Sequence, residues 1–576
     1  MFKLLSRAKP YVAQMSIAIV LLFAIAMLNL RLPKMMASII NIGIGNNDNA
    51  YIQKTGLMMI LISLCSVACQ ICANYLTSFS ATGFGRDLRI ETFKKITYYS
   101  IEQVDEFGTA ALITRTASDV REMERLLQAG LNSVVGMPLN MIGGIIMALS
   151  VDTSLAWVII VAMPLLLTII FISIKWVRPL FTAMREKLDN VSRVLRENLS
   201  GVRVIRAFNT IEKEHARFNA VNLDYTGSNR QARHRMALVN PLATIITSGT
   251  TVAVYWFGQF RIQSGALSAG DIMAFSQYVM QILFSVIRLQ QIFNLIPSAM
   301  SAADRLNKVL ESEPSIVDIE EPLTPLPGIV GRVAFNNVSF HYPGAENPVL
   351  KDISFEALPG QTTAIIGGTG SGKSTLVSLI PRLYDVQQGS IEVDGVDITK
   401  MSQSDLRSRI GFVTQKAQLF TGSIADNIAF GVAAASDSDI EFAANIAQAH
   451  DFISAMENGY DSFVSQDATN LSGGQKQRLS IARVVAKRPE IYVFDDSFSA
   501  VDLKTDAALR AALKKVTTNS AVIIVAQRVS TIMDAEQIIV LDEGKCVGKG
   551  THDELMGTCS VYKEIVDSQI KREEAA

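Results

Sequence analysis

The chain has 576 residues, of which 49% are hydrophobic and 19% are charged, and its formal net charge is -1. The mean hydropathy is positive, at +0.27. These values exclude a disordered chain, a collagen-like chain and a coiled-coil rod, and the balanced charge excludes a basic nucleic-acid-binding protein. Five cysteines are too few for a disulfide framework. A chain of this length and hydropathy is expected to have several domains, with one part in lipid and another in water.

Long apolar segments are confined to the first half of the chain. They are Val12–Leu30, Leu57–Phe79, Leu131–Val151, Leu155–Ile174, Ala237–Phe257 and Ile272–Ile287. Most of them approach or exceed the roughly 20 residues that cross a bilayer. Six such segments in one half of a chain disfavour the buried helices of a soluble protein. The sequence therefore predicts a transmembrane domain over residues 1–310, with the first segment retained and not cleaved as a signal peptide.

The charges between these segments predict their orientation. The loops after the first, third and fifth segments are short and nearly free of Lys and Arg, whereas those after the second and fourth are long and basic. By the positive-inside rule, both long loops and both chain termini are cytoplasmic. The long loops also have a helical pattern, so the spans are expected to continue into the cytoplasm as helical extensions. The expected location is the cytoplasmic membrane, as a multi-pass protein.

A linker and a second domain are predicted beyond the last span. Residues Glu311–Gly331 are rich in proline and acidic residues and are predicted to form the linker. After it, short apolar segments alternate with helical patterns. The expected strands are Arg332–Phe340, Thr362–Ile366, Ile491–Phe494 and Ala521–Val525, and the expected helix is Lys373–Ile380. This alternation predicts an α/β domain with a central sheet over residues 332–576.

A glycine-rich segment follows the apolar strand at Ala364–Ile366. It consists of Gly367, Gly368, Thr369, Gly370, Ser371, Gly372, Lys373, Ser374 and Thr375, and it matches the complete P-loop pattern. Its position between a strand and a helix is the context that supports a phosphate-binding loop over a chance glycine-rich turn. Backbone N–H groups and the helix N-terminus would bind the phosphates of a nucleotide. Lys373 is expected to reach the β- and γ-phosphates, and Ser374 to ligate Mg²⁺.

Two further motifs accompany the P-loop. The strand Ile491–Phe494 ends in Asp495 and Asp496, and an acid at the end of such a strand can hold Mg²⁺ through water. The other motif is Leu471, Ser472, Gly473, Gly474 and Gln475. It resembles the signature sequence of ABC ATPases. Together with six preceding spans, it makes the chain resemble a half-size ABC exporter over nearly its whole length.

This resemblance implies a fold, a set of site residues and a mechanism. The fold is a six-helix transmembrane domain with long cytoplasmic helical extensions, followed by an ABC ATPase domain with a helical subdomain. Tyr342 matches the adenine-stacking loop, Gln415 matches the loop that senses Mg²⁺ and the membrane domain, and Asp502 matches the D-loop. ATP with Mg²⁺ would lie between one domain's P-loop and another domain's signature. Short coupling helices are expected within Tyr99–Thr114 and Thr210–Phe218.

The chain departs from the family pattern at two positions of the P-loop site. Where the family usually has Glu after Asp495, this chain has Asp496, whose carboxylate lies about an ångström further back, and misplacement on that scale can cost about 10²-fold in rate. Where the family has a histidine, this chain has Gln527, which can neither become a cation nor shuttle a proton. This site is therefore expected to bind ATP and to hydrolyse it slowly or not at all.

An intact signature beside an altered P-loop site predicts a heterodimer. The chain resembles the degenerate-site subunit of bacterial heterodimeric multidrug exporters, in which a second half-transporter supplies the Glu and the His. The expected function is ATP-driven export of amphipathic small molecules, with a lipid bilayer but no nucleic acid as a further partner. Three alternatives stay open: a homodimer with two weak sites, a flippase for lipids or lipid-linked precursors, and an ATP-gated pore or regulatory subunit.

Overall fold

A computed structural model describes residues 1–325, 328 and 330–574 of the chain. Its contacts divide the chain into two units. The helical unit consists of Met1–Thr97 and Thr109–Ser312, and the α/β unit consists of Tyr98–Gly108 and Glu313–Ala576. Residues 326, 327 and 329 of the predicted linker lie outside the described residues. A short segment between two long helices of the helical unit thus belongs to the α/β unit.

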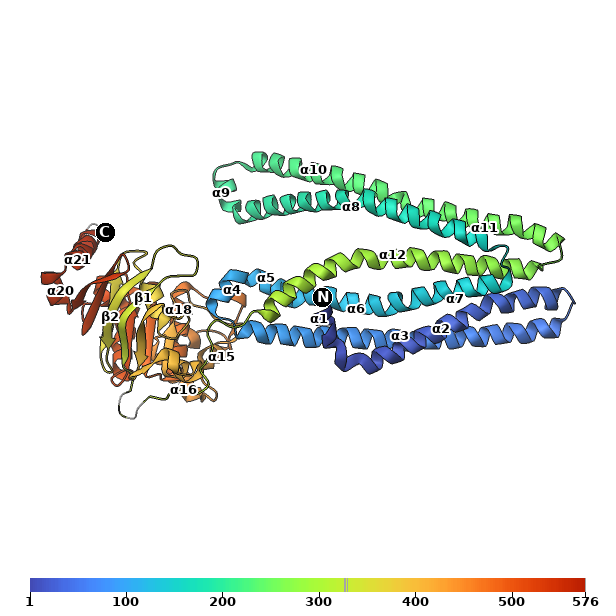
Figure 1. Cartoon of the computed structure of the whole chain (residues 1–576). Helices are drawn as coiled ribbons and strands as arrows, with labels where there is room; N and C mark the ends of the chain where they lie inside the picture. The colour runs from blue at the N-terminus through green and yellow to red at the C-terminus, as the bar shows by residue number, and fades with distance from the viewer. Residues whose placement is uncertain (326–327, 329, 575–576) are drawn as a thin grey trace. The chain divides into compact units, whose positions relative to one another are not determined.

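The helical unit is built from long and short helices joined by turns. They are α1 (Phe2–Leu5), α2 (Val12–Ser38), α3 (Asn49–Thr97), α5 (Thr109–Thr114), α6 (Val120–Ala129), α7 (Gly136–Val151), α8 (Ala156–Ser200), α9 (Val202–Ala207), α10 (Ile211–Ala237), α11 (Val239–Gln263) and α12 (Ala269–Glu311). Helix α2 packs against α3, α7 against α12, and α8 against α10 (Figure 1). At 49 and 45 residues, α3 and α8 are more than twice the length that a bilayer requires.

Six helical segments in the described part of the chain are long and apolar enough to cross a membrane. They are Lys3–Ile44, Asn49–Thr97, Thr109–Val151, Ala156–Ser200, Ile211–Gln263 and Ala269–Leu289. In order, they correspond to the six apolar segments of the sequence, and the predicted six-span domain with helical extensions is confirmed. Leu57, Leu61 and Leu64 on α3 are 61%, 58% and 61% exposed. Such an apolar outer surface suits lipid and not water.

The second predicted coupling segment, Thr210–Phe218, is misplaced. The short helix at this turn is α9, which ends at Ala207, and the long helix α10 has already begun at Ile211. Asn209 adopts a left-handed backbone with φ of 50° and forms the turn between them. Asparagine tolerates this conformation better than most residues, so the chain reverses earlier than expected. At the first turn, the short helix α4 (Ile101–Phe107) lies inside the predicted range Tyr99–Thr114.

The α/β unit contains a six-stranded sheet in the order β12-β11-β3-β10-β9-β6 and a four-stranded sheet in the order β2-β1-β4-β5. The strands are β1 (Val333–Phe340), β2 (Leu350–Ala357), β3 (Thr362–Gly367), β4 (Gln388–Val393), β5 (Val396–Asp397), β6 (Ile410–Val413), β7 (Gly422–Ser423), β8 (Phe463–Val464), β9 (Ile491–Asp495), β10 (Ala521–Val525), β11 (Gln537–Asp542) and β12 (Lys545–Gly550). In the larger sheet, β12 is antiparallel and the other neighbours are parallel.

Helices cover the larger sheet, and side chains on both faces of its strands are buried. Besides α4, the helices of the α/β unit are α13 (Lys373–Leu379), α14 (Gln403–Arg409), α15 (Ile424–Ala429), α16 (Asp437–Ile446), α17 (His450–Ser454), α18 (Gly473–Lys487), α19 (Leu503–Val516), α20 (His552–Thr558) and α21 (Ser560–Glu574). Of these, α13, α14, α18, α20 and α21 pack against strands of the larger sheet. In β3, Ala364 and Ile366 pack into one apolar core and Ile365 into a second. Strands that are buried on both faces have continuous apolar sequences, and the strands were predicted from such sequences. The predicted α/β domain with its central sheet is confirmed.

Candidate nucleotide site

Four adjacent parallel strands end at the same edge of the larger sheet. β3 ends at Gly367, β10 at Val525, β9 at Asp495 and β6 at Val413. Ligand sites of open α/β sheets form outside the carboxyl ends of the strands. The segments just beyond these four ends contain the P-loop, the second acid, the Gln527 turn and the Gln415 loop. The sheet order therefore brings together residues that are up to 160 positions apart, from Gly367 to Gln527.

The P-loop has the backbone of an anion-binding turn. Gly370 and Gly372 adopt left-handed φ values of 84° and 96°, which side chains rarely tolerate. A Cβ built on Gly370 meets no atom within 4 Å, so the loop leaves open space on this side. The buried Ser371 hydroxyl has no hydrogen-bond partner. A loop that is open, rich in N–H groups and followed by a helix N-terminus fits the phosphates of a nucleotide.

Lys373 lies across this loop. Its Nζ donates hydrogen bonds to the carbonyl oxygens of Gly367, at 2.9 Å, and of Gly368, at 2.7 Å. Burial lowers the pKa of Lys373, while the nearby carboxylates of Asp496 and Asp495 raise it. An anionic ligand would stabilise this ammonium group, because the group is partly desolvated and its hydrogen bonds go to neutral carbonyl oxygens.

Ser374 and Asp495 form the oxygen pair expected of a Mg²⁺ site. Ser374 Oγ donates to Asp495 Oδ1 at 2.9 Å. Burial raises the pKa of Asp495, the Ser374 hydrogen bond lowers it, and neighbouring Asp496 raises it further. A hydroxyl and a carboxylate are ligands that Mg²⁺ prefers, and a divalent cation would relieve the repulsion between two adjacent buried acids. The donor set therefore fits the cation that the sequence predicted.

The second acid, Asp496, is held by two amide side chains. Its Oδ2 accepts hydrogen bonds from Gln527 Nε2, at 2.7 Å, and from Gln415 Nε2, at 3.2 Å. Its backbone is left-handed, with φ of 48°, and Ser499 Oγ donates to its carbonyl oxygen at 3.0 Å. Burial raises the pKa of Asp496, whereas the hydrogen bond from Gln415 lowers it. The two residues that depart from the family pattern are thus in direct contact with each other.

The signature residues lie at the start of α18, away from the P-loop in sequence and on a different element. Ser472 caps this 15-residue helix in a reciprocal capping box: Gln475 N donates to Ser472 Oγ at 3.3 Å, and Ser472 N donates to Gln475 Oε1 at 2.9 Å. A Cβ on Gly474 would lie 3.1 Å from the carbonyl oxygen of Ala500. Leu471 is buried. The helix N-terminus carries a partial positive charge suited to a phosphate.

The two remaining predicted residues flank these features. Tyr342 and Thr375 are joined through their hydroxyls at 2.9 Å, and the Tyr342 ring packs edge-on against Phe340 and Tyr384. This places the predicted adenine-stacking ring beside the P-loop helix. Asp502 caps α19 by accepting a hydrogen bond from Thr505 N at 3.0 Å, and that bond lowers the pKa of Asp502.

Sequence reasoning missed several supporting residues. Gln569 on α21 donates from Nε2 to the carbonyl oxygen of Gln527 at 2.8 Å, and Val529 N donates to Gln569 Oε1 at 2.8 Å. Ser499 fixes the backbone of Asp496 in the same way. Gln569 bonds to main-chain atoms that only the fold brings near, whereas Ser499 bonds to a carbonyl oxygen three residues before it. No motif in the sequence could have identified Gln569, while Ser499 lies in the segment that leads to Asp502.

Comparison with known proteins defines the class. The family profile described as "ABC transporter transmembrane region" matches residues 15–286, and the profile "ABC transporter" matches residues 350–499. An uncharacterized ABC transporter ATP-binding protein of Mycobacterium tuberculosis is 39% identical over 564 residues, which cover 97% of each chain. A second one, from Bacillus subtilis, is 34% identical over 573 residues, covering 100% of this chain and 99% of the relative.

A third relative and a solved structure extend the comparison. The fatty acid ABC transporter ATP-binding/permease protein of Mycobacterium bovis is 33% identical over 479 residues, which cover 83% of this chain and 75% of the relative. A bacterial Atm1-family ABC exporter solved with ATP bound is similar in fold, with a TM-score of 0.81 and 24% identity over 97% of this chain and 98% of that chain. The chain belongs to the ABC transporter family, with the fold of a half-size ABC exporter.

Membership in the family establishes the general activity of the protein. The protein is a multi-pass membrane transporter with an ATP-hydrolysing domain, and exporters of this fold work as dimers in a lipid membrane. The ABC ATPase domain implies ATP binding, typically with Mg²⁺. The roles assigned to individual residues of the site stay predictions.

Proposed function

We propose that the protein is one half of a heterodimeric exporter of amphipathic small molecules, and that its own P-loop site binds ATP but hydrolyses it poorly. The observation that carries this proposal is the 2.7 Å hydrogen bond from Gln527 Nε2 to Asp496 Oδ2. It joins the two positions at which a general base and a switch histidine would be needed.

The geometry at Asp496 opposes general-base catalysis. A base must present a free oxygen to the attacking water at hydrogen-bond distance. Here Oδ2 already accepts from two amide groups, and these hydrogen bonds oppose the rise in the pKa of Asp496 that burial causes. The Gln527 amide cannot take up a proton. A cavity of about 10 Å³ borders Asp496 and Gln527, which is room for about one water, but neither neighbour is equipped to activate it.

The binding functions of the site are separate from this defect. The P-loop, Lys373 and the Ser374–Asp495 pair would hold the triphosphate and Mg²⁺, with Tyr342 against the adenine. When bound, ATP supplies the free energy that closes the two ATPase domains of a dimer. Gln415, which donates to Asp496, would position the metal and report it to the membrane domain. This site is thus suited to keep its ATP bound while the partner's site hydrolyses ATP.

A heterodimer accounts for the intact signature at the start of α18. In the proposed dimer, Ser472 and the helix N-terminus face the ATP bound to the partner's P-loop, where the partner provides the Glu and the His. The chain would therefore keep the residues that serve its partner's site and lose those that serve its own. The expected location is the cytoplasmic membrane of a bacterium, with the α/β unit in the cytoplasm.

A lipid is the second candidate for the substrate. The Mycobacterium bovis relative is described as a fatty acid transporter, and it aligns over 83% of this chain. Fatty acids and amphipathic drugs share an apolar body and a polar end, so one path could carry either. Accumulation of a fluorescent amphipathic cation in inside-out vesicles supports drug export, whereas ATP-driven movement of a labelled fatty acid without dye accumulation supports the lipid.

The heterodimer is tested by purification. We expect the full chain, purified alone in lipid, to hydrolyse ATP at a small fraction of the rate of the complex with its partner half-transporter. An Asp496→Asn variant of this chain should leave most of the complex's activity intact, because ATP binding at this site requires no general base. Full ATPase activity of the chain alone would instead establish a homodimer and overturn the proposal.

A further inference from the structure

The short helix α4 is fastened to the linker that follows the last membrane helix. In sequence, Tyr98–Gly108 lies between α3 and α5 of the helical unit, yet it belongs to the α/β unit together with the chain from Glu313 onward. Ser100 caps α4 through a capping box with Gln103. Both residues are buried, at 9% and 7% exposure. The buried side of α4 therefore carries polar groups that need partners.

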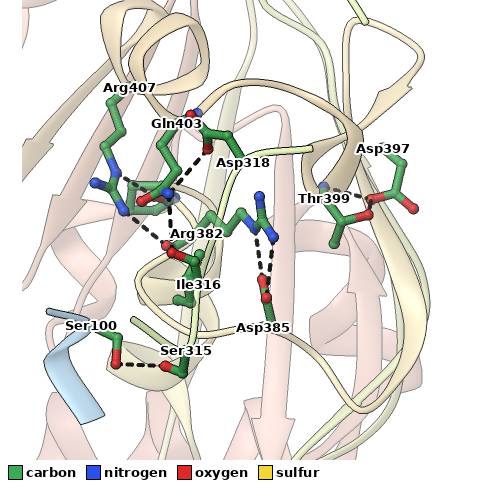
Figure 2. A network of polar contacts seen from close by, with 11 residues as sticks. Ser100, Ser315, Ile316, Asp318, Arg382, Asp385, Asp397, Thr399, Gln403 and Arg407 are labelled. Carbon is green, nitrogen blue, oxygen red and sulfur yellow. Dashed lines mark hydrogen bonds and ion pairs between the residues drawn. The ribbon is translucent and has the colours of Figure 1, made fainter. Parts of the chain in front are cut away.

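The Gln103 carboxamide finds its partners on the linker backbone. Its Nε2 donates to the carbonyl oxygen of Glu313 at 2.7 Å, and its Oε1 accepts from Ser315 N at 3.3 Å and from Ser100 N at 3.2 Å. The side chain thus pairs with main-chain groups of two residues that lie two positions apart in the linker. A carboxamide can do this because it carries a donor and an acceptor on one planar group. A second bond, from Ser315 Oγ to Ser100 Oγ at 2.7 Å, reinforces the contact (Figure 2).

The same linker is anchored to α14. Gln403 donates to Asp318 Oδ1 from its backbone N, at 3.0 Å, and from Nε2, at 3.1 Å, and Nε2 also reaches the carbonyl oxygen of Ile316 at 3.4 Å (Figure 2). Further along, Leu323 N donates to the carbonyl oxygen of Lys400 at 2.8 Å. The linker from Glu313 to Leu323 is therefore bonded at several points.

Helix α14 connects this assembly to the P-loop helix. Arg407 donates from Nε to the carbonyl oxygen of Pro381 and from Nη2 to that of Arg382, both at 3.1 Å (Figure 2). These residues follow α13, which begins at Lys373. In the same turn, the Tyr384 ring packs edge-on against Tyr342 at 5.4 Å. Burial raises the pKa of Tyr384 to about 12, with smaller contributions from Tyr342, Asp105 and Glu102.

We propose that Gln103 is a positioning residue that ties α4 to the linker, so that a nucleotide-dependent movement of the α/β unit reaches α3, α5 and α12 together. The chain itself makes these connections: α3 ends at Thr97, α5 begins at Thr109 and α12 ends at Glu311. Without the tie, α12 and α4 would follow the α/β unit independently. The inference rests on the ATP-driven transport common to the family, and neither the substrate nor the heterodimer enters it.

Hydrogen–deuterium exchange on the full-length transporter in lipid tests this proposal. In Gln103→Met, which keeps length and loses both hydrogen-bonding groups, we expect exchange at Ser100 and Ser315 to rise roughly fivefold, as for one lost hydrogen bond. ATP, Mg²⁺ and vanadate should still protect the P-loop peptide, residues 367–375, as in the wild type. Their effect on the peptides at the predicted outer loops, Asn46–Lys54 and Arg261–Asp271, should be lost. A merely structural role would weaken both responses together.

Two further variants complete the test. Glu106→Gln, at an exposed position of the same helix, is the matched control and should keep every response. Ser100→Cys with Ser315→Cys, in a background without the five native cysteines, should form a disulfide on oxidation and restore the outer-loop response to Gln103→Met. The proposal is overturned if Gln103→Met keeps that response, if the disulfide abolishes it in the wild-type background, or if the cysteine pair fails to form.

Discussion

Two regions of the α/β unit, the strand edge around Asp496 and the N-terminus of α18, keep the family pattern to very different degrees. At α18, Ser472 and Gln475 form a complete reciprocal cap at an accessible helix end. At the strand edge, the P-loop is complete. However, Asp496 stands where the family usually has Glu, Gln527 stands where it has His, and the two side chains bond to each other. In the proposed heterodimer, the first region would serve catalysis together with a neighbouring chain, and the second would serve binding alone.

Under the proposed function, nucleotide binding and hydrolysis depend on separable groups. Backbone N–H groups, Lys373 and the Ser374–Asp495 pair need no proton transfer, so they survive the loss of a general base. Hydrolysis depends on one carboxylate at the correct distance from a water. Under the proposed function, a shorter side chain at that single position, held by an amide, would remove the hydrolysis and leave the binding.

Breaking the intact region should have the largest effect. Gly474→Asp places a Cβ about 3.1 Å from the carbonyl oxygen of Ala500 and a negative charge at the α18 N-terminus. We expect the ATPase rate of the assembled transporter to fall by about 10²-fold or more, as when a preorganised donor at a phosphate is lost. Gly557→Ala, at a position where a Cβ meets no atom within 4 Å, should leave the rate unchanged. A rate unaffected by Gly474→Asp would show that this signature serves no active site.

Repairing the altered region should have the next largest effect. Asp496→Glu with Gln527→His restores the reach of the carboxylate and a titratable partner, and we expect hydrolysis in this site to rise by about 10²-fold. Each single change should achieve much less, because the two side chains share one hydrogen bond and act as a unit. Single-turnover hydrolysis, measured with the partner's own site disabled, checks this. Additive single effects would contradict the coupling.

The contrast between local and distant contacts also decides what the sequence could predict. The strand, loop and helix of the P-loop were expected at Thr362–Ile366 and Lys373–Ile380 and occur at Thr362–Gly367 and Lys373–Leu379, because this motif is set by neighbouring residues. The bond between Gln103 and Glu313 joins positions 210 residues apart, and no local pattern encodes it. The identity of Gln527 was visible in the sequence, but the direction in which its amide points was not.

At the adenine side of the site, the hydroxyl of Tyr342 should contribute a smaller effect. Tyr342→Phe keeps the ring and loses the bond to Thr375, so the Kd for ATP should rise about fivefold. Tyr342→Ala also loses the stacking surface and should weaken binding at least tenfold. A fluorescent-nucleotide titration measures both. Tyr460→Phe, which removes a comparable hydroxyl bond to His450, is the control. If Tyr342→Phe and Tyr342→Ala lose the same ATP affinity, the whole effect belongs to the hydroxyl and none to stacking.

The smallest expected effect is on stability and its dependence on pH. Burial raises the pKa of Asp496 in the folded protein, so between the ordinary carboxyl value and the raised one the folded state binds more protons than the unfolded state. Stability due to this group therefore falls as pH rises through that interval. Asp496→Asn removes the buried charge, so its Tm should exceed that of the wild type by an amount that grows as pH rises and then levels off.

Thermal unfolding of the full chain between pH 4.5 and 8 measures this difference. For a domain of this size, about 1 kcal/mol corresponds to roughly 2–4 °C in Tm. The control is Asp534→Asn at an exposed position, where the change in Tm should not vary with pH. If the Asp496→Asn difference shrinks as pH rises, then the amide groups of Gln415 and Gln527 stabilise the charged carboxylate by more than burial costs it. The strand edge would then hold a stable anion, and its weak hydrolysis would follow from low basicity alone.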